Sequence, residues 1–446
     1  MKELNISRIQ EDLEARADER VIFKGGRVID PASELDKPMD VVVEKGRVVS
    51  VEKNVRGTKD ARVINAQGMW VVPGLIDMHV HLREPGFEHK ETVATGARSA
   101  ASSGFTTILA MPNTNPVLDT AQSVRYVRGL GREADLCRVL SSGAITKGQL
   151  GEELASMVEL FEAGAVAFTD DGRPVTSAAM MRRALEYASH LGIVVISHAE
   201  DLTLSAGGHM HAGHVSCHMG FNGIPSAAEE VCVARDLILA ELTRGRLHLA
   251  HLSSKGSVRM LKEAKARGLD VTGEVTPHHF SLSHEAVRGY DTHAKMNPPL
   301  REPEDVSALI AALEDGTIDA IATDHAPHST LEKDLPFDEA AFGIIGLETA
   351  VPLTLALVQD ERLSPLRAIA LLSHGPAKCL GLPLGTLVPG SIADVTLIAP
   401  ELEWTARRFS SRSQNSPFVG AKLRGKAVLT MVAGKVVYEN IEGARA

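Results

Sequence analysis

Two histidines separated by one residue, His79 and His81, stand at the end of the apolar run 70–76. The run is typical of a buried strand, and side chains at positions i and i+2 of a strand point to the same face. Both imidazoles can therefore bind one metal ion. Arg83 continues that face, where its guanidinium can reach an anionic substrate. The pattern predicts a metal site that polarises a carbonyl in a carboxylate-bearing molecule. The alternative is a pair of hydrogen-bonded core histidines.

Apolar runs recur through the middle of the chain with helical stretches between them, as in repeated strand–helix units. Segments 176–191 and 229–244, for example, carry apolar residues at helical spacing. Eight such units over roughly 300 residues predict a (β/α)8 barrel of the TIM type, somewhat enlarged by insertions. The predicted strands are 74–82, 106–111, 139–144, 165–169, 194–198, 247–251, 271–275 and 318–323.

Both ends of the chain carry short alternating apolar segments, which predict antiparallel β-structure. We expect the two ends to form one small β-sandwich beside the barrel. The expected boundaries are an N-terminal extension 1–20, a first sandwich part 21–73, the barrel 74–384, and a second sandwich part with the C-terminal tail 385–446. Residues 1–18 look like a short charged helix or a frayed tail outside the core.

The composition argues against several classes of partner. The net charge of −10 disfavours nucleic acid and anionic membranes. No apolar segment is long enough to span a bilayer, and the charged N-terminus is unlike a signal peptide. The cysteines show no CxxC spacing and are typical of reduced thiols, so we expect a cytoplasmic protein. They are Cys137, Cys217, Cys232 and Cys379.

Potential metal ligands follow several predicted strands, at the rim where the active sites of such barrels lie. Besides the first strand, four strands end on an imidazole or carboxylate: Asp170 and Asp171, His198, His251, and Asp324. This set suits zinc, with manganese or cobalt as substitutes. It exceeds one tetrahedral zinc that keeps an open position, so two metals sharing a bridging carboxylate fit better. Neighbouring side chains on an extended segment point oppositely. Only one of the two adjacent aspartates should therefore bind metal, and the other should hydrogen-bond the backbone of the Gly172 turn.

Seven motifs resemble, in order and over nearly the whole chain from about residue 21, the dihydroorotase branch of the amidohydrolase superfamily. They are HVHLREPG (79–86), AMPNTNP (110–116), FTDDG (168–172), ISHAED (196–201), MNPPLR (296–301), ATDHAPH (322–328) and FGIIGLET (342–349). Members of this family reversibly cyclise N-carbamoyl-L-aspartate to L-dihydroorotate in pyrimidine synthesis. The resemblance implies a hydrolase with two zinc ions per chain.

The resemblance also implies a role for each ligand. His79 and His81 would bind the more buried metal, and His198 and His251 the more exposed one. Asp171 would bridge the two metals, and Asp324 would bind metal and move the proton.

Substrate contacts are implied in the same way. Arg83 and Asn113 look like the clamp on the carboxylate that does not react, because a guanidinium presents a planar fork to a carboxylate. The remaining contacts implied by the resemblance are His81, Asn297 and His328, with the backbone of Phe342 and Gly343 closing over the ring. Turn chemistry is the alternative for the two asparagines.

Three further features have weaker interpretations. Asp77 is expected to orient a ligand histidine. Segment 329–341 is either an active-site loop that closes on substrate or an ordinary surface loop. His278 and His279 end the seventh strand, yet the ligand set is complete without them.

A histidine cluster, His209, His211, His214 and His218, lies in an insertion after the fifth strand. The family pattern usually carries Asn-Glu where this chain has His211-Ala212. We expect a solvated or helix-capping role for this cluster rather than a third metal.

Two other functions remain open. Hydantoinases, dihydropyrimidinases and allantoinases typically bridge their metals with a carboxylated lysine at the end of the fourth strand, but 165–172 contains no lysine. A non-catalytic partner of aspartate transcarbamoylase would have lost ligands, and none is lost here. The resemblance implies a homodimer and leaves an association with aspartate transcarbamoylase open.

Overall fold

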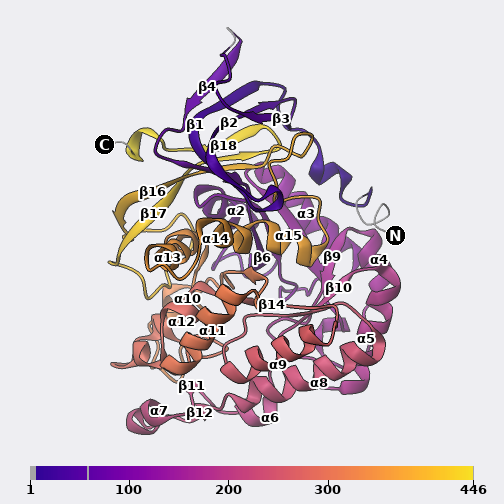
Figure 1. The fold of residues 1–446 in the computed structure, drawn as a ribbon. Helices are drawn as coiled ribbons and strands as arrows, with labels where there is room; N and C mark the ends of the chain where they lie inside the picture. Colours follow the sequence, from indigo (N-terminus) through magenta and orange to yellow (C-terminus); the bar gives the residue numbers. More distant parts are fainter. Residues whose placement is uncertain (1–6, 58–59, 445–446) are drawn as a thin grey trace.

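Eight parallel strands form one sheet in the computed structural model, which describes residues 7–57 and 60–444. Figure 1 shows the whole chain, with the β-strands of both chain ends lying together on one side. The eight parallel strands are β6 (Leu75–Val80), β7 (Phe105–Ala110), β8 (Arg138–Gly143), β9 (Ala165–Phe168), β10 (Val194–Ser197), β13 (Leu247–Leu249), β14 (Val271–Val275) and β15 (Ala320–Ile321). Each strand pairs with the next, and a parallel bridge between Val80 and His325 brings the last beside the first. The predicted barrel is confirmed, and each strand end lies within two residues of its predicted position.

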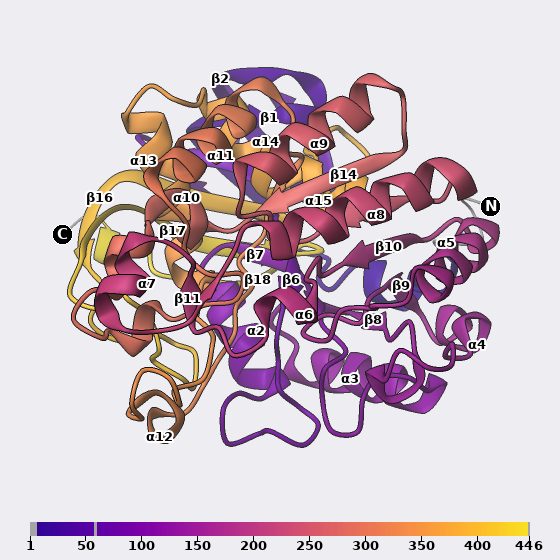
Figure 2. The same cartoon turned by 90° about the horizontal axis from the view of Figure 1, so that it is seen from below.

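Helices surround the strands, as Figure 2 shows for α3, α4, α5, α8 and α9. The main helices are α2 (Val93–Ser102), α3 (Ala121–Ala134), α4 (Met157–Glu162), α5 (Ala178–Leu191), α8 (Ala227–Thr243), α9 (Lys255–Ala266), α11 (Pro303–Asp315), α13 (Leu347–Gln359), α14 (Pro365–Leu372) and α15 (His374–Leu380). Side-chain oxygens of Thr92, Thr120 and Ser254 accept backbone N–H groups that α2, α3 and α9 leave without intrahelical partners. Each helix then buries one apolar face, as α5 does with Met181 and Leu185.

Shorter elements occupy the connections at the carboxyl ends of the strands. They are α6 (Leu202–Ser205), β11 (Met210–His211), α7 (His214–Met219), β12 (Gly223–Ile224), α10 (Pro277–Ser281), η4 (His284–Val287), η5 (Thr292–Ala294) and α12 (Thr330–Lys333). These connections form the rim that surrounds the mouth of the barrel.

Both ends of the chain contribute to one mixed sheet, called here the terminal sheet. Its strands are β1 (Arg20–Asp30), β2 (Leu35–Glu44), β3 (Arg47–Glu52), β4 (Ala61–Asn65), β5 (Trp70–Pro73), β16 (Val395–Thr405), β17 (Lys422–Val432) and β18 (Lys435–Glu439). The order is β18-β17-β16-β5-β1-β2-β3, with β4 on β1. β5 joins the two halves because it pairs with β1 on one side and β16 on the other. The expected union of both chain ends is confirmed.

The described part of the N-terminal segment packs against the base of the barrel. It contains the short helix η1 (Gln10–Leu13), and Ile9 is 1% exposed. Arg128 forms an ion pair with Asp12, and Arg138 donates through Nε to the Asp12 carbonyl. The expected short helix is present as η1, but the expectation that this segment lies outside the core is wrong at Ile9, Asp12 and Leu13, which are buried. The two arginines compensate the buried charge and carbonyl of Asp12. The expectation for residues 1–6 lies outside the described residues.

Two expectations drawn from composition concern the whole chain. The four cysteines form no disulfide, and Cys217 alone among them is exposed. Among the described residues, no helix has the length and apolar character needed to cross a membrane.

Candidate metal centre and substrate site

Six side chains converge at the carboxyl ends of the barrel strands: His79, His81, Asp171, His198, His251 and Asp324. Their side-chain atoms lie close together, with His79 Nε2 3.3 Å from an Asp171 oxygen and His81 Nε2 3.0 Å from an Asp324 oxygen. His198 Nδ1 lies 2.8 Å from His251 Nε2. All six are less than a tenth exposed. We call this group the main cluster.

The main cluster contains three overlapping triads whose donor atoms lie within 4.8 Å of one another. Asp171, His79 and His251 each belong to two of these triads. His79 Nε2 and one Asp171 oxygen are buried without a hydrogen-bond partner among the described residues. Buried lone pairs without partners are costly. A metal ion would satisfy them, so the residues present fit a metal site.

Backbone strain accompanies the main cluster. Arg83, His251 and Asp324 have φ values of 64°, 31° and 44°, in the left-handed region that side chains other than glycine rarely adopt. Such conformations cost of order 1–3 kcal/mol each and collect at functional sites. The fold thus holds these three side chains at positions that relaxed backbone would not give.

Hydrogen bonds fix which nitrogen of each ring faces the centre. His79 Nδ1 lies 2.7 Å from Glu274 Oε1, and His81 Nδ1 lies 2.8 Å from Asn113 Oδ1. His198 Nε2 lies 3.2 Å from Glu200 Oε2. Since these oxygens are acceptors, the ring nitrogen beside each of them carries the proton. The other nitrogen faces the main cluster, and in the neutral ring it carries the lone pair that a metal would bind.

Glu274 replaces Asp77 as the partner that orients a ligand histidine, which corrects one expectation. The Asp77 carboxylate accepts from Thr323 Oγ1 at 2.5 Å and from the His79 backbone N–H at 3.1 Å, and makes no bond to the His79 ring. Asp77 thereby ties the end of β15 to β6. The position of Glu274 within the buried strand β14 gave no sign of this role.

The side chains of the adjacent aspartates 170 and 171 point in different directions and have different partners, as expected. Asp171 enters the main cluster, whereas Asp170 accepts from the backbone N–H groups of Ile145 and Thr146 at 2.7 and 3.1 Å. Asp170 was expected to bond the Gly172 turn through its side chain. The loop after β8 takes that place because it lies closer to the carboxylate.

Charge coupling holds the main cluster in an ionised state. Burial alone raises the pKa of Asp171, but the charge of His79 and the nearby rings of His198 and His251 bring it well below its usual range. Burial likewise opposes protonation of His79, yet the carboxylates of Asp171 and Asp324 raise its pKa well above the usual value. The two carboxylates are therefore negative and ready to bind cations.

Arg83 lies beside the main cluster on the substrate side. Its Nε donates to the Pro327 carbonyl at 3.1 Å, and its Nη2 lies 3.3 Å from His328 Nε2. Nη1 has no hydrogen-bond partner among the described residues. Burial lowers the pKa of Arg83 to about 10, which still leaves the guanidinium charged at neutral pH. It is a preoriented cation with a free donor.

The two predicted asparagines have different surroundings. Asn113 uses Oδ1 to hold His81, and its Nδ2 lies next to Gly172; both residues line a cavity of about 430 Å³. Asn297 Nδ2 donates to Glu200 Oε2 at 3.0 Å. Neither is explained by turn chemistry alone, because Asn113 bonds His81 of the main cluster and Asn297 bonds Glu200, the partner of His198.

The backbone predicted to close over the ring is already engaged within the protein. Gly343 N–H donates to the Lys295 carbonyl at 3.0 Å, and the Gly343 carbonyl accepts from Asn415 Nδ2 at 3.0 Å. Lys295 Nζ lies 4.5 Å above the ring of Phe342. Gly343 has φ 151° and a Cβ there would lie 2.7 Å from the Ala326 carbonyl, so glycine is required.

Asn415 was missed from the sequence, although it holds this side of the site together. Its Oδ1 accepts the His328 backbone N–H at 3.0 Å, and its Nδ2 also donates to the Ala326 carbonyl at 2.9 Å. It comes from the segment between β16 and β17, far along the chain from its partners. No local motif marks such a residue.

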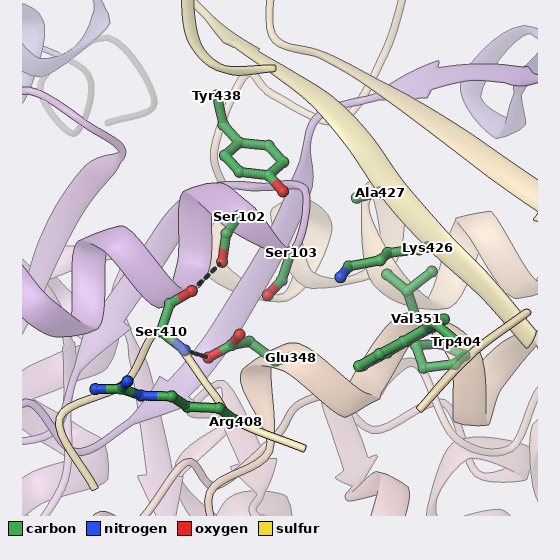
Figure 3. A pocket seen from close by; sticks show the side chains of 11 residues that line it. Ser102, Ser103, Glu348, Val351, Trp404, Arg408, Ser410, Lys426, Ala427 and Tyr438 are labelled. Atoms are coloured by element: carbon green, nitrogen blue, oxygen red, sulfur yellow. Dashed lines mark hydrogen bonds between the residues drawn. The ribbon is translucent and has the colours of Figure 1, made fainter. Parts of the chain in front are cut away.

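A polar pocket lies at the junction of the barrel and the terminal sheet, and residues of both line it (Figure 3). One oxygen of Glu348 accepts the backbone N–H groups of Ser410 and Ser411, at 2.6 and 3.1 Å. The Ser411 hydroxyl bonds Glu91, whose Oε2 lies 3.3 Å from His325 Nε2. This buried chain of hydrogen bonds links the terminal sheet to the residue that follows Asp324.

Segment 329–341 is tied at several points. It contains α12, where Lys333 Nζ donates to the carbonyls of Ala341 and Gly343 at 2.7 and 3.1 Å. Burial lowers the pKa of Lys333 to about 7. Closure of this segment on substrate stays a prediction.

His278 and His279 lie outside the main cluster. His279 Nε2 donates to the Pro298 carbonyl at 2.9 Å, and its Nδ1 lies 2.7 Å from Thr276 Oγ1. His279 thereby supports the loop that carries Asn297.

Comparison with known proteins places the chain in a family. A family model described as dihydro-orotase-like matches residues 68–257. The dihydroorotase of Geotalea daltonii is 52% identical over 421 residues, which cover 94% of this chain and 99% of that protein. The dihydroorotase of Anaeromyxobacter dehalogenans is 52% identical over 429 residues, with 95% and 99% covered. The chain belongs to the dihydroorotase family. The resemblance in its motifs is confirmed, and the chain is a cyclic amidohydrolase.

Solved structures of related enzymes share the architecture. The L-hydantoinase of Arthrobacter aurescens superposes with a TM-score of 0.84 at 28% identity, covering 94% of this chain and 96% of that one. The dihydropyrimidinase of Brevibacillus agri gives 0.80 at 23% identity, with 94% and 95% covered, and this likeness shows the fold alone. The barrel with a terminal sheet is thus a frame that this chain shares with these enzymes.

Proposed function

We propose that the chain catalyses the reversible, zinc-dependent cyclisation of N-carbamoyl-L-aspartate to L-dihydroorotate. The observation that carries this proposal is the main cluster beside a buried guanidinium with a free Nη1. Membership of the dihydroorotase family supports the same substrate.

Two zinc ions would be held by the main cluster. His79 and His81 would bind one ion, His198 and His251 the other, and Asp171 would bridge them, with Asp324 as a further ligand. When bound, such ions lower the pKa of water and polarise a carbonyl group. The buried, partner-free nitrogen of His79 and oxygen of Asp171 support this placement.

Asp324 would move the proton. In ring opening, its carboxylate accepts a proton from the nucleophilic water and returns it to the ring nitrogen whose bond to the carbonyl carbon breaks. Ring closure uses the same groups in reverse. His81 lies 3.0 Å from Asp324 and His79 lies 3.6 Å from it, so the carboxylate is held at the centre. Proton transfer of this kind contributes about 10²–10⁴-fold in rate.

Arg83 would select the substrate. Its free Nη1 and the Nδ2 of Asn113 are the donors we assign to the carboxylate that does not react. Asn297, His328 and the Phe342–Gly343 backbone would enclose the ring, with Gly343 acting through its position because its own N–H and carbonyl are engaged.

The test is ring opening of L-dihydroorotate, with the metal content counted on the same sample before chelation, after chelation and after zinc return. Turnover that follows two zinc ions per chain is the expected result. Arg83→Gln should raise KM and keep both metals, whereas unchanged KM would remove Arg83 from substrate binding.

A ring-opening enzyme for hydantoin-type substrates is the second candidate, because the L-hydantoinase structure is so similar. Those substrates lack the free carboxylate that Arg83 would bind. Turnover of hydantoin or allantoin in place of L-dihydroorotate would favour this candidate. If two metals are bound and none of these substrates reacts, adding aspartate transcarbamoylase tests for a missing partner, and light scattering tests the expected homodimer.

A further inference from the structure

A second group of histidines lies at the rim, away from the main cluster. Helix α7 and strand β11, which lie side by side (Figure 2), bring His214 and His211 close to His284 in η4. The ring centroids are 6.0 Å apart for His214 and His284, and 5.5 Å for His211 and His284. In the main cluster His79 and His81 are also 5.5 Å apart. The spacing is therefore that of rings able to share an ion.

Two sets of donors meet at His284. One of its ring nitrogens lies within 4.8 Å of donor atoms of His214 and Glu285, and one lies within 4.8 Å of donor atoms of His211 and Glu302. The two sets share His284, so the surroundings of the other members decide which set can bind a metal.

His284 lacks hydrogen-bond partners for its ring. The residue is 4% exposed, and its Nδ1 is buried without a partner among the residues that the structure describes. Its Nε2 lies 3.7 Å from Glu285 Oε1, beyond hydrogen-bond distance. A buried ring nitrogen without a partner is costly. This is the same sign that marks His79 in the main cluster.

His211 is excluded by its neighbour. Arg301 Nη1 donates to His211 Nδ1 at 3.2 Å, so the proton of the neutral ring sits on Nε2, the atom 3.9 Å from Glu302. Arg301 is 2% exposed and also donates to the Ile224 carbonyl at 2.9 Å, so it cannot move away. The His211 nitrogen that faces Glu302 therefore has no lone pair with which to bind a metal.

His214 has a neighbour that can leave. Arg288 Nη2 lies 2.9 Å from His214 Nε2 and also forms an ion pair with Glu285. Arg288, His214 and Glu285 are all exposed. Water can solvate the guanidinium when it is displaced, which leaves two imidazoles and a carboxylate.

We propose that His214, His284 and Glu285 form a divalent-metal site, with zinc as the fitting ion and water at the fourth position. Two imidazoles and one carboxylate are a frequent zinc donor set. The bound ion would join α7 to η4, and the chain from η4 leads through η5 to Asn297. The ion would thus brace the rim without taking part in the reaction. The proposal does not depend on the proposed function.

The experiment compares zinc binding by the full-length protein and three variants, each with the main cluster loaded. Equilibrium dialysis at buffered low-micromolar free zinc is followed by elemental analysis. His214→Ala and Glu285→Gln remove ligands from the surface and leave the buried His284 in place. His218→Ala is the matched control, because His218 is exposed on the same helix and belongs to neither set.

We expect the unaltered protein and His218→Ala to bind one more zinc ion per chain than His214→Ala and Glu285→Gln. Equal zinc content in all four proteins would overturn the site. Loss of the additional ion in His218→Ala would also overturn it, because the ion would then bind elsewhere on α7. If the additional ion binds only at millimolar zinc, it is an adventitious surface ion, and the proposed site is overturned.

Discussion

The main cluster and the rim cluster at His284 gather histidines at similar spacing but surround them with opposite partners. In the main cluster, Glu274, Asn113 and Glu200 accept the outer N–H of three rings. At the rim, Arg301 and Arg288 donate toward His211 and His214. An acceptor behind a ring leaves the other nitrogen with its lone pair, whereas a donor consumes a lone pair.

The comparison teaches that histidine spacing alone does not define a metal site. Burial has the same double effect in both places. It makes each unbonded nitrogen costly, and it fixes the neighbours that decide whether the nitrogen is free. Strong binding is expected where acceptors are buried with the ligands, and weaker binding where the competing cation is exposed.

The largest expected effect separates the chemistry of the main cluster from mere metal binding. Asp324→Asn should lower turnover of L-dihydroorotate by about 10²–10⁴-fold, because an amide cannot accept the proton. Initial rates and elemental analysis on one sample check this. His214→Ala, from the rim cluster, is the control and should keep normal turnover. An Asp324→Asn protein with both metals and near-normal turnover would contradict the role of Asp324.

The next effect tests the acceptor behind a ligand ring. Glu274→Gln should weaken metal affinity by about 10–100-fold, because the His79 ring loses a charged partner. Asp77→Asn is the matched control, since Asp77 is equally buried but bonds the backbone of His79 and the backbone and hydroxyl of Thr323, not the His79 ring. Chelator competition measures both affinities. If Asp77→Asn weakened metal binding more than Glu274→Gln, Asp77 and not Glu274 would be the residue that orients His79.

A smaller effect is expected on the substrate side. Asn415→Ala should raise KM more than it lowers kcat, because the Gly343 carbonyl and the His328 N–H lose their common partner. The unpaired buried groups should also lower the free energy of unfolding by about 1–3 kcal/mol. Gln414→Ala is the control, as its side chain bonds only Phe409 and Ser411 of its own segment. Equal kinetic changes in both variants would show a general loosening of the segment.

The strands and the main-cluster residues could be predicted because local signals coincide there. Many of the barrel strands are short apolar runs, and a ligand such as His198 or His251 stands within two residues of a strand end. The barrel rule then brings strand ends together without knowledge of tertiary contacts.

Residues whose role depends on distant contacts could not be predicted. Glu274 lies inside a strand and resembles any core position, and Asp77 was favoured only because it is near His79 in sequence. Asn415 meets His328 across 87 positions of chain. His284 stands in an irregular segment whose approach to α7 no periodicity encodes.

The smallest expected effect concerns the exposed arginine of the rim cluster. Arg288→Gln should tighten zinc binding there by about fivefold, because a cation adjacent to His214 and paired with Glu285 is removed. The same substitution should leave the main cluster unchanged. Arg259→Gln on α9 is the control, since Arg259 is also exposed and also paired with a glutamate, Glu263. Zinc titration of the metal-loaded proteins measures the difference. Unchanged or weaker zinc binding in Arg288→Gln would show that Arg288 does not compete with the ion. A donor beside an exposed histidine would then not oppose metal binding.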